Sequence, residues 1–231
     1  FAPLDRDHVL ERLAGGNETE VYWTDDRQYV VKLKHELGGN PREAIEWART
    51  MRAVAEHYSI CLGEQHTIPN YYLVARDGDG QAHALVIQPY VAGAQPLDAI
   101  DYRALDAAQR SALALQLSEI IRRAHAFYQA TGGMPDLYGR SSSSSAERQR
   151  MKSLAMLPRR LWSFLVQRNL LRSHNLMLAQ SPAIRVILVD YDPVRQSKIY
   201  KLVYFAVRRI LLVRDLILIS CLRSGWYIPQ G

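Results

Sequence analysis

Two short apolar segments near the end of the chain, residues 176–179 and 186–189, constrain the fold most strongly, because each has a polar residue at its boundary. Asn175 directly precedes the first segment and Asp190 directly follows the second. We expect two neighbouring strands whose ends project an amide and a carboxylate together. Magnesium (Mg²⁺) takes hard oxygen ligands of this kind. The pattern predicts that oxygen atoms of Asn175 and Asp190 lie together at these strand ends; the alternative is an ordinary turn with a capping aspartate.

The first 90 residues have the pattern of a small antiparallel sheet with one helix. Residues 9–34 contain strand-like segments that are separated by turns, and residues 71–76 and 83–91 flank the sequence Asp-Gly-Asp-Gly, a strong hairpin signal. Between these pairs, residues 38–57 place Pro41 in a first helical turn and repeat apolar residues at helical spacing. We therefore expect two antiparallel strand pairs and one helix.

Beyond residue 101 the pattern is mainly helical. Residues 104–128 predict a long amphipathic helix, and a break at 132–140 precedes a serine run at 141–145. Residues 198–222 predict a closing helix, in which Lys201, Arg208 and Asp215 recur every seven residues and so share one side. We expect this side to be the one wet edge of a mostly buried helix. Its charges disfavour a membrane span, and a peripheral membrane contact is a less favoured alternative.

Composition narrows the class of protein without choosing a function. The 231 residues carry a net charge of +6, which favours anionic partners such as phosphorylated metabolites, nucleotides or acidic lipid. Cys61 and Cys221 are isolated and lack the spacing of a metal site, which is typical of reduced thiols in a cytoplasmic protein. Basic clusters on helices are usually solvated faces, so we expect no nucleic-acid partner.

The order of these elements resembles the protein-kinase-like superfamily, and within it the branch of aminoglycoside and choline phosphotransferases. The sheet-rich residues 1–90 correspond to an N-terminal lobe, and residues 91–231, which end in two short strands with Asn175 and Asp190 at their ends, correspond to a C-terminal lobe. The resemblance implies an α+β, bilobal fold with an N-terminal antiparallel sheet, one helix and a mainly helical C-terminal lobe. It also implies ATP and Mg²⁺ as cofactors, with Asn175 and Asp190 as the residues that hold Mg²⁺.

The resemblance assigns the phosphate-binding residues of the first lobe. Gly15 and Gly16 lie where the family has its glycine-rich turn, although the third glycine is missing, and Val21 would cover the nucleotide base. Lys32 matches the family's phosphate-binding lysine; the alternative is that it forms a solvated pair with Lys34. Its partner acid would come from the following helix.

For that partner acid, Glu43 is our first choice and Glu46 the second. The segment that would join the lobes implies four further cofactor-binding residues. Gln88 would flank the adenine pocket, the backbone of Pro89 and Val91 would bond the base, and Gln95 would reach the ribose.

The catalytic aspartate of the family is missing from its expected place. It normally lies five residues before the metal-binding asparagine, where this chain has Leu170. The nearest substitute is Asp136, which could still meet Asn175 if residues 141–168 loop out between them. The alternative is that Asp136 is an ordinary turn aspartate.

The favoured function is transfer of a phosphoryl group from ATP to a hydroxyl of a small molecule or protein. Lys32 and Glu43 would position the phosphates, and Asp136 would act as the base. The absence of an aspartate at position 170 favours an alternative of another class, a pseudokinase that binds nucleotide without efficient catalysis. A third reading is a basic adaptor for lipid or nucleic acid. Few residues follow Asp190, so a large peptide-binding platform is not expected.

Overall fold

The computed structural model describes residues 11–15, 19–38, 40–76, 78–139, 169–180, 183–191 and 198–226. The chain divides into two compact units. The first unit comprises Phe1–Ala53 and Pro69–Val91, and the second comprises Val54–Ile68 and Ala92–Gly231. Helix α1 (Pro41–Leu62) begins in the first unit and ends in the second.

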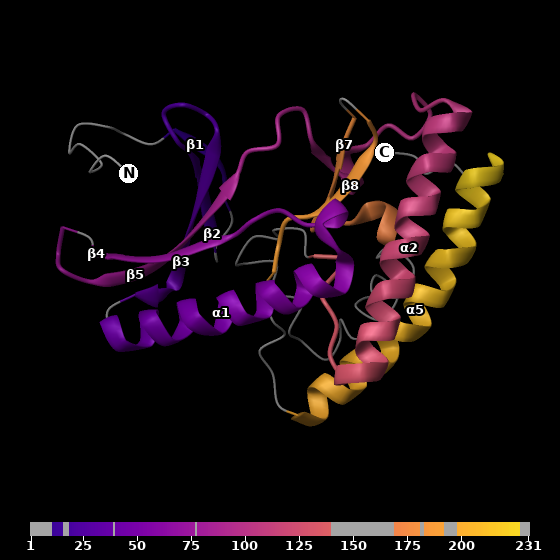
Figure 1. Cartoon of the computed structure of the whole chain (residues 1–231). Coiled ribbons are helices and arrows are strands. Elements are labelled where there is room, and N and C mark those ends of the chain that lie inside the picture. The colour runs from indigo at the N-terminus through magenta and orange to yellow at the C-terminus, as the bar shows by residue number, and fades with distance from the viewer. Residues whose placement is uncertain are drawn as a thin grey trace, which may run out of the picture. The chain divides into compact units, whose positions relative to one another are not determined.

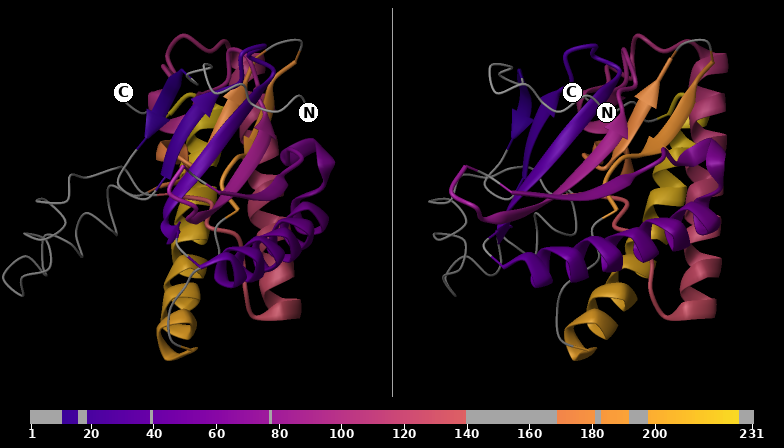
Figure 2. Two further views of the ribbon diagram at one scale, coloured as in Figure 1. Left: turned by 90° about the vertical axis from the view of Figure 1, so that its left-hand side faces the viewer. Right: turned by 60° about the vertical axis from the view of Figure 1, so that its left-hand side comes forward.

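The first unit is built on a five-stranded antiparallel sheet in the order β1-β2-β3-β5-β4 (Figure 1, Figure 2). Its strands are β1 (Arg12–Gly15), β2 (Thr19–Trp23), β3 (Tyr29–Gly38), β4 (Tyr71–Arg76) and β5 (Ala82–Pro89). The two sequence-based hairpins are both present, and β5 pairs with both β3 and β4. The side chains of β5 alternate as expected for a strand with one covered face, because every second side chain from Ala82 onward is buried.

The first half of α1 covers one face of this sheet. Trp47, Ala48 and Met51 recur at helical spacing and pack against Ala84 and Val86 of β5. The apolar row explains why this segment is a helix that lies on the sheet. Asn40 begins it, since its side-chain oxygen accepts a hydrogen bond from the backbone N–H of Arg42 at 3.0 Å.

The described part of the second unit contains two long helices, α2 (Ala107–Thr131) and α5 (Lys198–Ser224), which pack side by side (Figure 1). A capping box starts α2: Asp106 accepts a hydrogen bond from the backbone of Gln109 at 2.8 Å, and Gln109 accepts one from the backbone of Asp106 at 2.9 Å. Gly132 ends α2 in the left-handed conformation, with φ of 73°. These caps fix where the segment after α2 begins.

The same unit also holds a small antiparallel sheet of β6 (Gln95–Pro96), β7 (Leu176–Ala179) and β8 (Arg185–Leu188). Three single turns of 3-10 helix accompany it: η1 (Glu64–His66), η2 (Leu97–Ala99) and η5 (Leu170–Arg172). Buried His66 holds β8 through a contact of 2.9 Å between its Nδ1 and the carbonyl of Val186, and burial lowers the pKa of this histidine.

The α+β fold class that the sequence predicts is confirmed: an antiparallel sheet with one helix, followed by a mainly helical part. The predicted helix at 198–222 is present as α5. None of the described helices is both long enough and apolar enough to cross a membrane.

The predicted wet edge of α5 is wrong. Arg208 and Asp215 are only 3% and 1% exposed, whereas the side chains of Ile210, Val213 and Ile217 face solvent. Burying a charged side chain requires partners that compensate its lost hydration, and Arg208 and Asp215 find such partners inside the second unit. The side chain of Lys201, the third member of the predicted stripe, lies outside the described residues.

Candidate functional site

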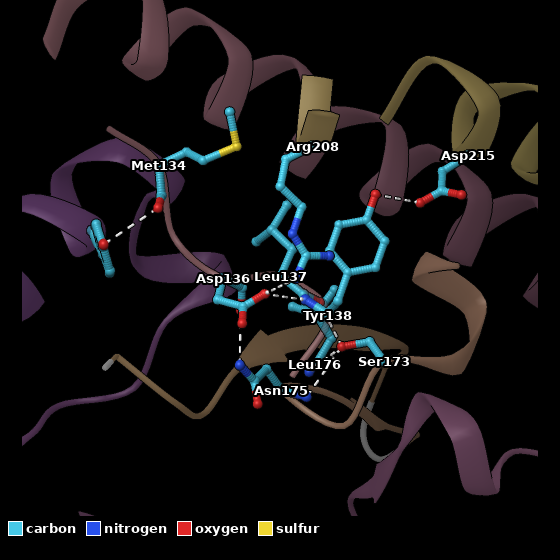
Figure 3. Close-up of polar contacts among 10 residues, drawn as sticks. Met134, Asp136, Leu137, Tyr138, Ser173, Asn175, Leu176, Arg208 and Asp215 are labelled. Carbon is cyan, nitrogen blue, oxygen red and sulfur yellow. Dashed lines mark hydrogen bonds and ion pairs between the residues drawn. The ribbon is translucent and has the colours of Figure 1, made fainter. Parts of the chain in front are cut away.

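The segment that follows α2 is tied directly to the segment that precedes β7 (Figure 3). Buried Ser173 donates a hydrogen bond from its Oγ to the carbonyl of Leu137 at 2.6 Å, and the same oxygen accepts from the backbone N–H of Asn175 at 3.1 Å. Asn175 in turn donates from Nδ2 to the carbonyl of Asp136 at 2.8 Å. The two segments are far apart in sequence, yet Asp136 and Asn175 are in contact.

Gly139 allows this close approach. Its φ of 69° lies in the left-handed region, and a methyl group on its α-carbon would overlap the side-chain oxygen of Asn175. The backbone N–H of His174 also donates to the carbonyl of Tyr138 at 3.0 Å. Residues 136–139 therefore pack against residues 173–175 through both backbone and side-chain contacts.

The carboxylate of Asp136 is held by two donors. Its Oδ1 accepts a hydrogen bond from the backbone N–H of Tyr138 at 3.1 Å and lies 3.3 Å from Nη2 of Arg208 (Figure 3). The guanidinium of Arg208 also lies over the ring of Tyr138, 4.2 Å from its centroid. Asp136 is partly exposed, so an oriented carboxylate with a balancing cation sits at the edge of a buried network.

Asp215 connects α5 to both segments. Its Oδ2 accepts hydrogen bonds from the hydroxyl of Tyr138 at 2.7 Å and from the backbone N–H of Leu170 at 3.1 Å, and its Oδ1 lies 2.7 Å from Nη2 of Arg214. Burial raises the pKa of Asp215, while Tyr138 and Arg214 favour its ionised form. Burial and the neighbouring carboxylate of Asp215 also raise the pKa of Tyr138.

Leu170 occupies the position at which the resemblance led us to look for a catalytic aspartate. It begins η5 with a fully buried side chain, and its backbone N–H is bound by Asp215. A buried leucine supplies no proton acceptor. Asp136, which comes from the segment after α2, is an acidic residue that contacts Asn175.

The two strand ends named at the outset are neighbours. β7 and β8 pair antiparallel with Leu176 opposite Leu188, and the backbone N–H of Val189 donates to the carbonyl of Asn175 at 2.9 Å. Asp190 is the next residue and is half-buried. Tyr191 anchors the segment after β8, because its hydroxyl accepts from the backbone N–H of Ile68 at 3.0 Å.

The predicted phosphate-binding residues lie in the sheet of the first unit. Val21 on β2 and Lys32 on β3 are directly opposite each other, so their half-buried side chains share one face. Lys32 is also opposite Val86, whose side chain packs against α1. Lys32 therefore points to the face of the sheet that α1 covers. Both candidate acids of α1, Glu43 and Glu46, are exposed, and their pairing with Lys32 stays a prediction.

The remaining predicted cofactor-binding residues are spread over β1, β5, β6 and the segment between β5 and β6. Gly15 ends β1, and Gly16 falls outside the described residues. Gln88 on β5 is buried, and its Nε2 donates to the side-chain oxygen of Asn70. Pro89 ends β5, Val91 closes the first unit half-buried, and Gln95 is exposed on β6 of the second unit. Their predicted roles stay predictions.

Comparison with known proteins decides the family. The model of the phosphotransferase enzyme family, APH, matches residues 9–191. The chain belongs to this family. The resemblance to kinase-like phosphotransferases is thereby confirmed, and phosphotransferase chemistry is the general activity of the group to which the chain belongs.

Two solved structures match the chain at low similarity. One is the GDP and kanamycin complex of APH(2″)-IIIa, with 15% identity and a TM-score of 0.43, covering 92% of this chain and 78% of that one. The other is the GDP complex of wild-type aminoglycoside 2′-phosphotransferase-IIIa, with 15% identity and a TM-score of 0.44, covering 94% of this chain and 79% of that one. No curated protein matches the chain significantly in sequence.

The donor set of this APH-family chain fits a magnesium ion. The hydrogen bond from Nδ2 of Asn175 to Asp136 fixes the amide, which would leave Oδ1 as its oxygen donor, and Asp190 would supply a carboxylate. The described residues contain no group of three or more His, Cys, Asp or Glu that could enclose a metal on their own. Two protein oxygens suit an ion that completes its coordination with water and phosphate oxygens.

Sequence reasoning missed the residues of α5 that hold the site. The seven-residue spacing of Arg208 and Asp215 in an otherwise apolar helix was visible, but it was interpreted as a solvent-facing edge. Ser173 and Gly139 left a weaker signal, since each is an ordinary loop residue until its partners are known. The partners of Arg208 and Asp215 are Asp136 and Tyr138, which lie more than 70 positions away.

Proposed function

We propose that the chain transfers the terminal phosphoryl group of ATP to a hydroxyl group of a small molecule or protein. The observation that carries this proposal is the contact between Asn175 and the segment of Asp136 in a chain of the phosphotransferase family. That contact holds the backbone carbonyl of Asp136, the candidate base, against a candidate metal ligand. Family membership supports the reaction class, and the acceptor is proposed only as a class of compound.

In this proposal Asp136 orients the attacking hydroxyl and accepts its proton. Phosphoryl transfer depends mainly on alignment and on neutralisation of phosphate charge. Asp136 suits alignment because the N–H of Tyr138 and the guanidinium of Arg208 hold its Oδ1. Arg208 is a positioning residue here, since it acts through Asp136.

Asn175 and Asp190 would hold Mg²⁺, which when bound neutralises the phosphate oxygens of the nucleotide. Lys32 would bind the phosphates, and Glu43 would position that lysine. The nucleotide would be recognised by the further residues that the family resemblance implies, namely Gly15, Gly16, Val21, Gln88, Pro89, Val91 and Gln95. These assignments rest on the family pattern and on the shared sheet face of Val21 and Lys32.

A second candidate function is nucleotide binding without efficient catalysis, as in a pseudokinase. Two observations favour it. Leu170 stands buried where the family pattern has its acid, and the carboxylate of the substitute Asp136 is already engaged by buried Arg208. Both candidates require nucleotide binding, and they differ in turnover.

One experiment separates these candidates from each other and from a protein that binds no nucleotide. Thermal unfolding is followed with ATP and Mg²⁺, and ADP formation is measured with water, amino alcohols and kanamycin as acceptors. We expect a Mg²⁺-dependent stabilisation and ADP formation, both lost in Asp190→Asn and kept in Glu64→Gln, an exposed control in the same unit. Stabilisation without ADP formation supports the pseudokinase, and an unchanged melting temperature contradicts both proposals.

A further inference from the structure

The exposed side of α5 is apolar. Ile210, Val213 and Ile217 are 70%, 62% and 62% exposed, and their spacing of three and four residues puts them on one face of the helix. Leu216 borders them and is also exposed. Surface helices normally present polar side chains to water, so a row of aliphatic side chains at this exposure marks an interaction site. We call Ile210, Val213, Leu216 and Ile217 the exposed face of α5.

The apolar surface continues from α5 onto α2. Leu115 of α2 is exposed, and it lines a shallow groove together with Leu216 and Ile219 of α5. Arg223 borders the same groove. The patch is therefore wider than one helix, and a cation lies at its edge.

The charges around this face are basic. Asp215 is the only acidic residue of α5 and is buried, whereas Arg209 and Arg223 are exposed. On the neighbouring α2, Glu119 is balanced by two arginines of its own helix, at 2.7 Å and 2.5 Å. An approaching surface thus meets apolar side chains and positive charge, which complements an anionic surface.

An aromatic side chain ends the helix. Gly225 has φ of 78°, and the backbone N–H of Trp226 donates to the carbonyl of Cys221 at 3.0 Å, which closes the helix with a Schellman motif. The apolar residue at this position of the motif often packs on the last turn, yet Trp226 is 91% exposed. Tryptophan is enriched where protein meets the interface of a membrane with water.

We propose that the exposed face of α5, with Trp226 and the flanking Arg209 and Arg223, docks on an anionic lipid surface. The helix would lie in the plane of the interface, with its aliphatic row at the boundary of the acyl chains and its arginines among the headgroups. A second copy of the chain is a poorer occupant, because it would bring the same arginines against each other. The opposite side of α5 carries Arg208, so docking leaves the contact with Asp136 in place.

Vesicle co-sedimentation of the full chain tests this proposal without nucleotide, so its outcome is independent of the proposed phosphoryl transfer. Vesicles of phosphatidylglycerol and phosphatidylcholine are compared with phosphatidylcholine alone. We expect binding to the anionic vesicles that weakens with salt and that falls about tenfold or more in Ile210→Ser/Val213→Ser/Ile217→Ser. Ile60→Ser, which changes an equally exposed isoleucine on α1, should bind as the wild type does.

Circular dichroism verifies that the triple variant keeps its fold. Tryptophan fluorescence gives a second readout, independent of sedimentation. Anionic vesicles should shift the emission of the wild type to shorter wavelength, and Trp226→Phe should lack this shift. Absence of binding to anionic vesicles overturns the proposal, as does equal binding by the folded triple variant. The proposal is also overturned if the wild type forms a dimer, the triple variant does not, and neither binds vesicles. That result would assign the exposed face of α5 to a second copy of the chain.

Discussion

The two faces of α5 contrast in an unusual way. Its buried face carries the charged Arg208 and Asp215, and its exposed face carries Ile210, Val213 and Ile217. The buried charges are tolerated because each meets an ordered partner, Asp136 for the arginine and Tyr138 for the aspartate. At these two positions burial therefore follows the partners that the loops offer rather than the polarity of the side chain.

The contrast separates two tasks of one helix. The buried face fixes the segments that hold Asp136 and Leu170, so changes there should disturb folding and the candidate site together. The exposed face makes no such contact with these segments in the described part of the chain, so changes there should affect docking alone. The predictions below test this separation.

Asp215→Ala should have the largest effect on stability, because it removes the acceptor that Tyr138 and Leu170 share. Loss of one member of a buried ion pair lowers the free energy of unfolding by about 3–5 kcal/mol. Denaturant unfolding measures this change. The matched control on the exposed face, Ile217→Ser, should change it by less than about 0.5 kcal/mol. Equal losses in the two variants would show that the faces are wrongly assigned.

Gly139→Ala should have the next largest effect on stability, and Gly132→Ala is its matched control. Both glycines have left-handed φ values, 69° and 73°, but only at Gly139 would the added methyl group overlap Asn175, since nothing lies within 4 Å at Gly132. Backbone strain alone should cost each about 1–2 kcal/mol, and overpacking should cost Gly139→Ala about 1–3 kcal/mol more. Denaturant unfolding compares the two. If they lose the same stability, the contact with Asn175 is not formed.

The pH dependence of stability gives a smaller effect from the same buried face. Burial raises the pKa of Asp215, so the folded chain binds this proton more tightly than the unfolded chain does. The free energy of unfolding therefore falls as the pH rises from about 4 through the raised value, by at most about 1.4 kcal/mol per pH unit. Asp215→Asn should lack this slope when unfolding is measured across that range. Identical pH profiles would contradict a buried, titrating Asp215.

Sequence reasoning succeeded where periodicity alone decides the structure. The two strand-like segments around the Asp-Gly-Asp-Gly turn predicted the hairpin, and the polar boundaries of β7 and β8 predicted that Asn175 and Asp190 end neighbouring strands. Both signals are local, because they depend on residues within one or two adjacent segments.

Sequence reasoning failed where the burial of a side chain depends on partners that are distant in the sequence. The spacing of Arg208 and Asp215 correctly indicated one side of a helix, but periodicity fixes only the relative positions of side chains and not which side faces inward. That choice is made by Asp136 and Tyr138, which come from the segment after α2. The contact between Asp136 and Asn175, on which the proposed role of Asp136 rests, is likewise set by three-dimensional packing.

The most direct test of the central claim compares the rate of ADP formation from ATP and Mg²⁺ by the wild type and by Asp136→Asn. Water serves as the phosphoryl acceptor if none of the hydroxyl compounds tested supports turnover. The account predicts that the wild type turns over and that the variant is slower by about 10²–10⁴-fold. The ATP-induced shift in melting temperature should be equal in the two proteins. Turnover that survives in the variant would remove Asp136 from the reaction, and ATP binding without turnover in the wild type would make the chain a pseudokinase.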